Sequence, residues 1–431
     1  HPILKMKQHK KLALYGGNPL IANPFPAYNT IGKEEIEAAN KVLKSGILSG
    51  FVGARGQGFE GGEEIKMLEK EVAQYFKIKH CIAVNSWTSG LVAIIGALDI
   101  EPGDEIIVTP WTMVATATAI LQWNAIPVFV DIDETTFNLD PQKIEAAITT
   151  RTKAIIYADI FGQSGDVDSL MKIAKAHNLK VISDTAQSPG ALYKGKFAGT
   201  LTHIGGFSLN YHKHIHCGEG GLVVTNDDYL AKKVKLIRNH GEAVIQSNDP
   251  KEIANILGQN FRLGEIEAAI ARQQLKKLNG FIKSRQIAAE RLKKGLAGLK
   301  GLIMPKVFKD CTHVYYVFGL IISDEKMIKN RQLIADALKA EGVPGLIVGY
   351  QNIHLNPIFI NRIAYGKNGF PWKGIEFKES KIIYESNLCP IAERLHNKTF
   401  LGILLCQHFY TNKEIDLMIS CFKKVWECLD L

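Results

Sequence analysis

The fold is decided by residues 81–98, which read CIAVNSWTSGLVAIIGAL. The apolar run at residues 81–84 is typical of a short buried strand, and the apolar run at residues 91–98 is typical of a helix. The segment between them, residues 85–90, is rich in polar and small side chains. This order of strand, loop and helix begins a βαβ unit, so we expect a parallel strand to follow.

The same alternation continues on both sides of this stretch. Strands are expected at residues 105–109, 127–130, 154–157, 180–183, 206–209 and 221–225, and helices at residues 33–44, 63–76, 114–123 and 167–177. Strands that alternate with helices form a largely parallel sheet with both faces covered. We therefore predict a large α/β domain at residues 30–275, preceded by an N-terminal arm at residues 1–29.

The pattern changes near residue 276. Helices are expected at residues 263–278, 285–299, 330–341 and 413–429, with one strand-like run at residues 313–322. This mixture predicts a smaller C-terminal α+β domain at residues 276–431. Residues 350–384 are rich in Asn, Gly, Pro and aromatic side chains and are interpreted as a long loop, a kind of segment that is often functional.

Composition excludes several classes of protein. Of the 431 residues, 46% are apolar and 22% are charged, as in soluble globular proteins. The net charge of +9 comes from Lys and Arg spread along the chain, so nucleic-acid binding is not expected. No apolar run approaches the ~20 residues of a membrane span. The seven cysteines form no CxxC pair, which argues against a zinc site or a disulfide framework and favours a cytoplasmic location.

One literal motif is misleading. Residues 56–61, GQGFEG, satisfy the pattern GxGxxG. That pattern indicates a dinucleotide site only when it lies between a strand and a helix, and residues 45–55 do not have the pattern of a strand. We interpret it as a flexible loop.

A better candidate is the segment NSWTSG at residues 85–90. Thr88 and Ser89 lie where the helix at residues 91–98 opens. Backbone N–H groups and hydroxyls at a helix N-terminus bind phosphate well. An ordinary helix cap is an equally good interpretation of the same residues.

Two further segments carry charged side chains. Asp184 follows an apolar pair at the end of an expected strand, the edge of a parallel sheet where ligands bind. A carboxylate there can hold a protonated heteroaromatic nitrogen, or it can simply cap the next turn. Lys213 lies between two strand-like runs, after Ser208 and before the Gly-rich turn at residues 218–221. A buried lysine forms Schiff bases, whereas most lysines are surface charges.

In this order the segments resemble the fold-type I pyridoxal-phosphate enzymes, and specifically the DegT/StrS family of sugar aminotransferases. The family's phosphate loop, DxAQ, SFxxxK and GEGG motifs correspond to residues 88–89, 184–187, 208–213 (with Leu209 for the usual Phe) and 218–221. Further similar segments extend from residues 16–17 to residues 389–390. The resemblance implies an aspartate aminotransferase-like fold, with a large cofactor-binding domain and a small C-terminal domain.

The resemblance also implies roles for individual residues. Lys213 would carry pyridoxal 5′-phosphate through a Schiff base, and Asp184 would pair with its pyridine nitrogen; these two would be the catalytic residues. Gln187 would lie near the phenolic oxygen of the cofactor. Three hydroxyl side chains would hold its phosphate, namely Thr88, Ser89 and Ser208.

Two positions need separate comment. Family members often place an aromatic side chain over the cofactor ring directly after a Thr, but here Thr112 is followed by Met113, so either Met113 or Trp111 would cover the ring. Asn260 resembles the residue that reaches the phosphate of the neighbouring subunit, which implies a homodimer with shared active sites. Alternatively, Asn260 caps the helix that begins near Leu263.

Three histidines, His212, His214 and His216, alternate with the period of a strand and would face one side of it. Such a row could suggest a metal, but no carboxylate completes the set. We therefore expect no metal and interpret the histidines as a polar rim of the cofactor site.

The resulting prediction is an aminotransferase that moves an amino group from glutamate or glutamine to a ketosugar, with a nucleotide-linked sugar favoured. In this mechanism Lys213 is the general base and acid. Residues 109–112 and 389–390 also resemble members that act on ketocyclitols, so that substrate class stays open. Relatives that dehydrate sugars carry a histidine in place of the lysine, and Lys213 argues against that activity. A noncatalytic amino-sugar sensor on the same fold is opposed by the intact Lys213, Asp184 and Gln187.

Overall fold

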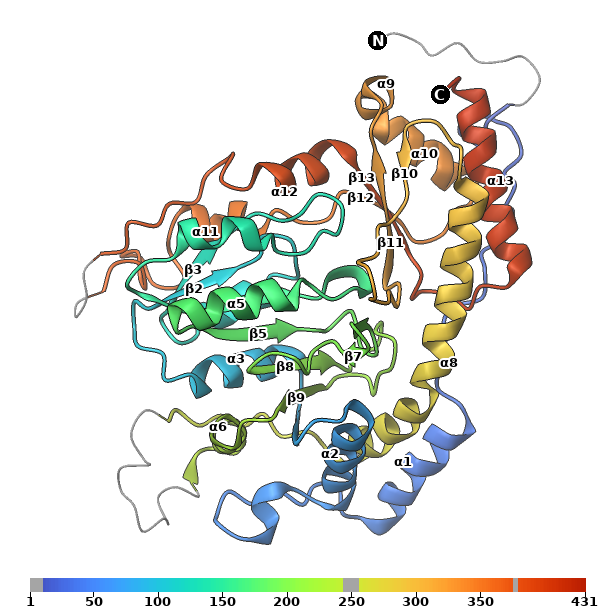
Figure 1. The fold of residues 1–431 in the computed structure, drawn as a ribbon. Coiled ribbons are helices and arrows are strands. Elements are labelled where there is room, and N and C mark those ends of the chain that lie inside the picture. The colour runs from blue at the N-terminus through green and yellow to red at the C-terminus, as the bar shows by residue number, and fades with distance from the viewer. Residues whose placement is uncertain (1–10, 243–255, 375–378) are drawn as a thin grey trace.

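A seven-stranded sheet forms the centre of the structure (Figure 1). The computed structural model describes residues 11–242, 256–374 and 379–431. In this sheet the five neighbouring strands from β8 (Ile204–Ser208) to β3 (Ile126–Phe129) pair in parallel. Strand β9 (Gly221–Thr225) is antiparallel to both of its neighbours. The predicted largely parallel sheet is therefore confirmed. In spatial order the strands are β1 (His80–Val84), β9 (Gly221–Thr225), β8 (Ile204–Ser208), β5 (Lys180–Asp184), β4 (Thr152–Ala158), β2 (Glu105–Val108) and β3 (Ile126–Phe129).

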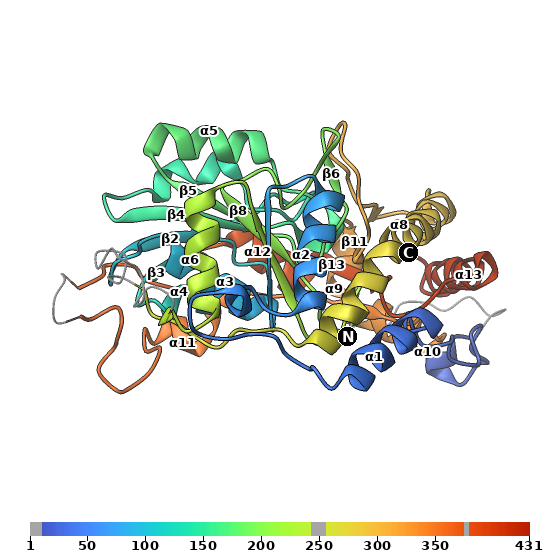
Figure 2. The same ribbon diagram turned by 90° about the horizontal axis from the view of Figure 1, so that it is seen from below.

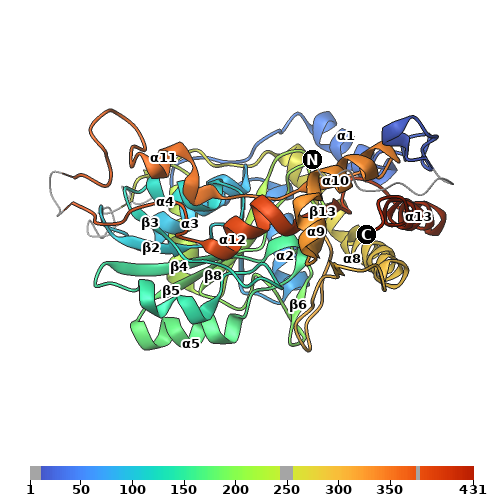
Figure 3. The same ribbon diagram turned by 90° about the horizontal axis from the view of Figure 1, so that it is seen from above.

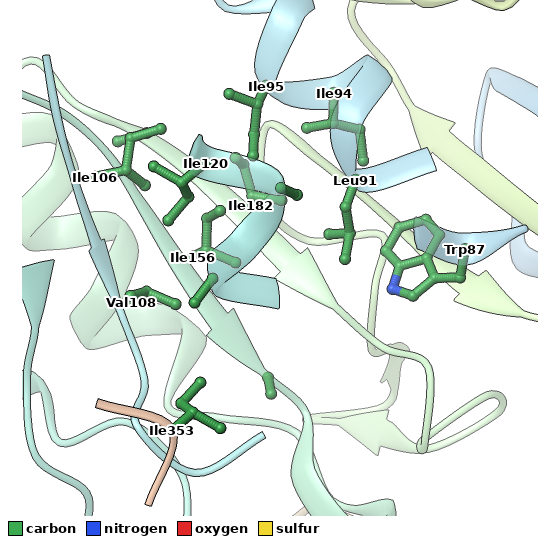
Figure 4. Close-up of a cluster of buried hydrophobic side chains, with 14 of the residues drawn as sticks. Trp87, Leu91, Ile94, Ile95, Ile106, Val108, Ile120, Ile156, Ile182 and Ile353 are labelled. Atoms are coloured by element: carbon green, nitrogen blue, oxygen red, sulfur yellow. The ribbon is translucent and has the colours of Figure 1, made fainter. Parts of the chain in front are cut away.

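Successive side chains of a strand point to opposite faces of the sheet. Here the side chains on both faces are apolar, so helices cover both faces. Ile106 and Val108 of β2 belong to a buried cluster with α3 (Trp87–Ala97), α4 (Ala115–Leu121) and α6 (Asp228–Arg238), part of which Figure 4 shows. Ile107, between them, belongs to a cluster on the other face with α5 (Val167–His177). Figure 2 shows α5 on one side of the sheet and α3 and α4 on the other.

The predicted helices and strands of this region occur close to their expected ends. The largest difference is at α3, which begins at Trp87 because the Ser86 hydroxyl accepts a hydrogen bond from the Ser89 N–H at 3.0 Å and caps the helix earlier than the apolar run suggests. Helices α1 (Lys33–Ser45) and α2 (Glu63–Phe76) begin where expected. Of the N-terminal arm, residues 1–10 lie outside the described residues, and Leu12 and Ile21 are buried against the C-terminal part.

The two helices expected at residues 263–278 and 285–299 are a single helix, α8 (Glu265–Leu296). Gly280 lies within it, and a helical Gly costs only ~1 kcal/mol relative to Ala. Packing offsets this cost, because α8 contacts α1 and α2 in one part and α13 (Asn412–Cys428) in another. In Figure 1 this helix runs along one side of the molecule from α1 to α13. Residue 275, the predicted domain boundary, lies within α8, and the division itself stays a prediction.

The C-terminal part is built on a four-stranded antiparallel sheet, which confirms the predicted small α+β unit. Its strands, in spatial order, are β10 (Leu302–Ile303), β11 (Val317–Ile322), β13 (Phe400–Leu404) and β12 (Leu346–Val348). Apolar side chains of α8, α10 (Arg331–Ala340) and α13 form one cluster with this sheet. Figure 3 shows these elements together, away from β2 and β3.

Residues 350–384 are largely irregular, as expected, apart from a short turn at Ile353–Leu355 and α11 (Pro357–Ile360); residues 375–378 lie outside the described residues. The segment is anchored on the large sheet, because Trp372 Nε1 donates to the Tyr384 hydroxyl at 2.9 Å and that hydroxyl donates to the Pro127 carbonyl at 2.6 Å. The remaining elements are β6 (Leu192–Tyr193), β7 (Lys196–Phe197), α9 (Glu325–Lys329), α12 (Pro390–Arg394) and short turns at Ala13–Tyr15, Gln57–Glu60, Pro141–Lys143, Glu145–Ala147, Ile160–Gly162 and Leu395–Thr399.

In the described parts of the chain, none of the helices combines the length and the apolar character that crossing a membrane requires.

Candidate active site

An open cavity of about 270 Å³ lies at the carboxyl edge of the large sheet. Its walls come from residues at or just after the ends of β1, β4, β5 and β8, from the loop between β2 and α4, and from the first turns of α3 and α4. Ligands of open α/β sheets bind at this edge, where the loops after parallel strands converge. The cavity brings together most of the predicted site residues, namely Thr88, Met113, Asp184, Gln187, Ser208 and Lys213, whereas Ser89 and Asn260 do not line it.

Asp184, the last residue of β5, is buried and held by three hydrogen-bond donors. Trp87 Nε1 donates to Oδ1 and the Thr116 hydroxyl donates to Oδ2, each at 2.7 Å. The Ala186 N–H donates to Oδ1 at 3.2 Å. These donors fix the carboxylate plane and stabilise its negative charge. Sequence reasoning did not identify Trp87 or Thr116, because neither residue is near Asp184 in the chain.

Lys213 lies in the turn after β8 and is only 9% exposed. Burial lowers the pKa of its amine, while the negative charge of Asp184 acts in the opposite direction. Its Nζ atom lies 4.6 Å from the centre of the Tyr316 ring, a face that attracts a cation. A lysine whose charged form is disfavoured by burial is a competent nucleophile and base.

The segment that follows Asp184 is fixed by a second buried carboxyl group, which sequence reasoning also missed. Asp159 accepts from the Thr185 hydroxyl at 2.7 Å and from the Gly165 N–H at 2.9 Å. Burial raises the pKa of Asp159 to about 7. Gln187 lines the cavity, and both ends of its amide are engaged: Oε1 accepts from the Phe161 N–H at 2.9 Å, and Nε2 donates to the Tyr350 hydroxyl at 3.0 Å.

Residues 85–90 contain both a helix cap and a part of the cavity wall. Ser86 is the helix cap, and its hydroxyl lies 2.9 Å from the Ser89 hydroxyl. Thr88 lines the cavity in the first turn of α3, together with Ser208 from the end of β8. The first N–H groups of a helix have no partner within it, so this edge of the cavity suits an anion.

The structure distinguishes Met113 from Trp111. Met113 lines the cavity and is 57% exposed. Trp111 is completely buried in the core, where it packs against Phe161 and Tyr350. Of these two residues, Met113 is therefore the one placed to contact a ligand in the cavity.

Asn260 lies on the exposed surface outside this cavity, paired with Asn239 through a main-chain bridge. Its Oδ1 accepts from the Arg262 N–H at 3.4 Å. It does not cap the following helix, because the cap of α8 is Gly264. Its role toward a neighbouring subunit stays a prediction.

The three histidines do not form the expected row, because residues 209–220 form turns between β8 and β9 rather than a strand. His212 lines the cavity, and burial, assisted by the charge of Lys213, lowers its pKa to about 4. His214 points elsewhere: its ring is buried and donates to the Val314 carbonyl at 2.9 Å. Among the described residues, no group of three or more His, Cys, Asp or Glu side chains could hold a metal ion.

The GxGxxG segment forms a short turn at Gln57–Glu60 directly before α2, and no strand precedes it in residues 46–56. It does not line the cavity. The geometry that a dinucleotide fingerprint requires is therefore missing from this segment.

A sequence profile described as the DegT/DnrJ/EryC1/StrS aminotransferase family matches residues 29–374. The chain belongs to this family. Among relatives, it is 34% identical to the spore coat polysaccharide biosynthesis protein SpsC of Bacillus subtilis, over 81% of this chain and 89% of that protein. It is 37% identical to GDP-perosamine synthase of Caulobacter vibrioides (69% and 78%) and 30% identical to L-glutamine:2-deoxy-scyllo-inosose aminotransferase of Streptomyces kanamyceticus (82% and 83%).

Solved structures agree with this assignment. An aminotransferase from Psychrobacter cryohalolentis superposes with a TM-score of 0.80 at 29% identity, covering 95% of this chain and all of that one. DesV of S. venezuelae, solved in complex with a ketimine intermediate, gives 0.76 at 28% identity (92% and 95%). E. coli GDP-4-keto-6-deoxy-D-mannose-3-dehydratase, solved with bound hydrated PLP, gives 0.77 at 26% identity (93% and 99%).

Removing one donor from Asp184 should slow this aminotransferase. Thr116→Val keeps the side-chain shape but deletes the hydrogen bond to Oδ2, and a hydrogen bond to a charged group contributes ~1.5–3 kcal/mol. We expect kcat to fall about tenfold or more. The matched control is Thr118→Val on the same helix, whose hydroxyl donates to the Val114 carbonyl. Equal steady-state rates for the two folded variants would contradict this role of Thr116.

Proposed function

We propose that the chain is a pyridoxal-phosphate-dependent enzyme that transfers an amino group from glutamate or glutamine to a ketosugar, with a nucleotide-linked sugar as the favoured acceptor. The observation that carries the proposal is a buried lysine, Lys213, in the same cavity as a firmly held carboxylate, Asp184. This pair is what a Schiff-base enzyme with a pyridine cofactor needs.

The polar groups of the cavity fit pyridoxal phosphate. Asp184 offers a carboxylate to the ring nitrogen, Lys213 offers an amine to the aldehyde, and Gln187 offers an amide to the phenolic oxygen. Thr88 and Ser208, with the N-terminus of α3, offer hydroxyl and N–H donors to the phosphate. Met113 would contact the ring face. Ser89 does not line the cavity, so we assign it to the support of Ser86.

When bound, pyridoxal phosphate supplies an electron-withdrawing ring that stabilises negative charge on the substrate carbon next to the nitrogen. Asp184 would accept a hydrogen bond from the ring nitrogen and would favour its protonated form. Lys213 would hold the aldehyde carbon of the cofactor, and its amine, when free in the cavity, would move a proton as general base and then acid. Burial assists this step because it favours the neutral amine.

The sugar substrate is proposed from the relatives. GDP-perosamine synthase and a dTDP-3-amino-3,4,6-trideoxy-alpha-D-glucose transaminase, 32% identical over 77% of this chain, bear nucleotide-sugar names. A ketocyclitol is the second candidate, favoured by the similarity to L-glutamine:2-deoxy-scyllo-inosose aminotransferase over 82% of this chain. The dehydratase among the structural neighbours is a weaker guide, because Lys213 is present here where the dehydratases have histidine.

A half-reaction screen should separate the two substrate classes. The purified enzyme is first converted to its aminated form with glutamate or glutamine, and keto substrates are then added singly. We expect nucleotide-linked ketosugars to restore the absorbance of the unaminated cofactor and ketocyclitols to leave it unchanged. The reverse result would assign the enzyme to cyclitols, and no response to any keto compound would contradict the aminotransferase proposal.

The cofactor link can be tested chemically. Borohydride reduction should fix pyridoxal phosphate on Lys213, because this is the lysine whose amine is buried in the cavity. Peptide mass spectrometry locates the adduct. Lys213→Ala should still bind the cofactor but lose transamination, and Lys276→Ala, on the surface of α8, is the control. An adduct on any other lysine would refute the assignment.

We also propose a homodimer in which Asn260 reaches the partner's phosphate. Its exposed position outside its own cavity supports this, since a residue there is free to reach another chain. A Lys213→Ala chain and an Asn260→Ala chain, each impaired alone, should regain part of the activity when they are refolded together. One of the two sites in a mixed dimer then has both intact residues. Verified mixed dimers without any recovery would argue against a shared site.

A further inference from the structure

Gln187 is held by two residues that are remote from it in the chain. Its Oε1 accepts from the Phe161 N–H at 2.9 Å, just after β4, and its Nε2 donates to the Tyr350 hydroxyl at 3.0 Å, just after β12. The two contacts come from opposite parts of the fold, the large sheet and the C-terminal sheet. The amide is therefore located where these parts meet.

The contact to Phe161 fixes which way the amide faces. A backbone N–H can only donate, so the amide oxygen must point at it. Phe161 has φ +60°, a left-handed conformation that is rare for a bulky residue and that only a well-packed surrounding maintains. The amide nitrogen carries two N–H groups, and Tyr350 accepts one of them. One N–H remains for a ligand in the cavity that Gln187 lines.

Tyr350 is itself firmly placed. Its N–H donates to His396 Nδ1 at 3.1 Å, and its ring stacks on Trp111 with centroids 6.0 Å apart. Gly349, with φ +72°, makes the turn between β12 and Tyr350, and its N–H donates to the Phe400 carbonyl of β13. Burial raises the pKa of Tyr350 to about 12, so its hydroxyl stays protonated and uncharged at neutral pH.

We infer that Tyr350 is a positioning residue of the cofactor site, which transmits the position of the C-terminal sheet to the Gln187 amide and aims its remaining N–H at the phenolic oxygen of pyridoxal phosphate. This inference rests on the proposed function, which places Gln187 beside that oxygen. Tyr350 does not line the cavity, so it acts through Gln187 alone. Without the hydroxyl, one amide N–H has no partner, and the amide, still held at Oε1 by the Phe161 N–H, can tilt about that contact so that its other N–H loses its aim.

The direction of the effect follows from simple electrostatics. A hydrogen bond donated to the phenolic oxygen withdraws electron density from it, which weakens its attraction for the proton on the neighbouring Schiff-base nitrogen. That hydrogen bond therefore lowers the pKa of the Lys213 Schiff base. Loss of correct aim should raise this pKa.

The test is a pH titration of the absorbance of the bound cofactor in four holoenzymes: wild type, Tyr350→Phe, Gln187→Leu and the double variant. We expect Tyr350→Phe to raise the Schiff-base pKa by roughly half a unit to one unit and to lower kcat several-fold, with cofactor still bound. The matched control is Tyr384→Phe, which removes another buried tyrosine hydroxyl of the C-terminal segment, one that bonds Trp372 and Pro127 instead. It should titrate like the wild type.

The outcomes distinguish a failure of the inference about Tyr350 from a failure of the proposed function. A Tyr350→Phe titration equal to the wild type, with Gln187→Leu shifted, would overturn the inference and leave the proposed function intact. A double variant that titrates like Gln187→Leu supports action through Gln187, whereas additive shifts would overturn it. If the wild-type enzyme shows no Lys213-linked absorbance, the proposed function itself fails.

Discussion

The arrangement of the cavity depends on one buried carboxylate, that of Asp184. A charge at the end of a central strand is costly unless hydrogen-bond donors surround it. Trp87, at the start of α3, and Thr116, in α4, supply those donors from two different helices. The same contacts therefore bind the N-terminal ends of α3 and α4 to β5. Gly206 of β8 permits this, because a Cβ there would lie 2.3 Å from the Trp87 ring.

The hydrogen bonds to Asp184 also fix the position of the cavity edge that suits a phosphate. Since Trp87 is the first residue of α3, the contact with Asp184 sets where the helix N-terminus lies relative to the end of β5. Thr88 follows in the same turn, and Ser208 ends the neighbouring strand β8. A flat ligand that binds Asp184 at one end thus meets anion-binding groups in a fixed direction. The fold provides this spacing before any ligand binds, which reduces the ordering cost of binding.

The C-terminal part holds two of the cavity's residues in place without lining the cavity itself. Tyr316, just before β11, presents its ring to Lys213, and Tyr350, just after β12, holds Gln187. Both strands belong to the same antiparallel sheet. A shift of that sheet would therefore change the surroundings of the lysine and of the amide together.

Much of this could be predicted from the sequence, and the exceptions have physical reasons. The period of apolar residues located the strands, and Asp184, Lys213 and Gln187 were found because they lie in ordered local motifs. Trp87, Thr116 and Tyr350 were not assigned, because their importance depends on contacts across 97, 68 and 163 positions of the chain. Such contacts exist only after the sheets assemble. The histidine row failed for the opposite reason, since a period-two pattern was read as a strand although the Gly-rich residues 218–221 favour turns.

The state of Lys213 follows from the same carboxylate. Burial favours its neutral amine, whereas the negative charge of Asp184 and the face of Tyr316 favour the ammonium form. Burial is the larger effect on the pKa of Lys213. Three neutral donors already stabilise the charge of Asp184, which reduces its attraction for a nearby cation. A protonated ring nitrogen bound at Asp184 would reduce this attraction further, so ligand binding would favour the neutral amine of Lys213. The donors that orient Asp184 therefore also help to keep Lys213 available as a nucleophile and base.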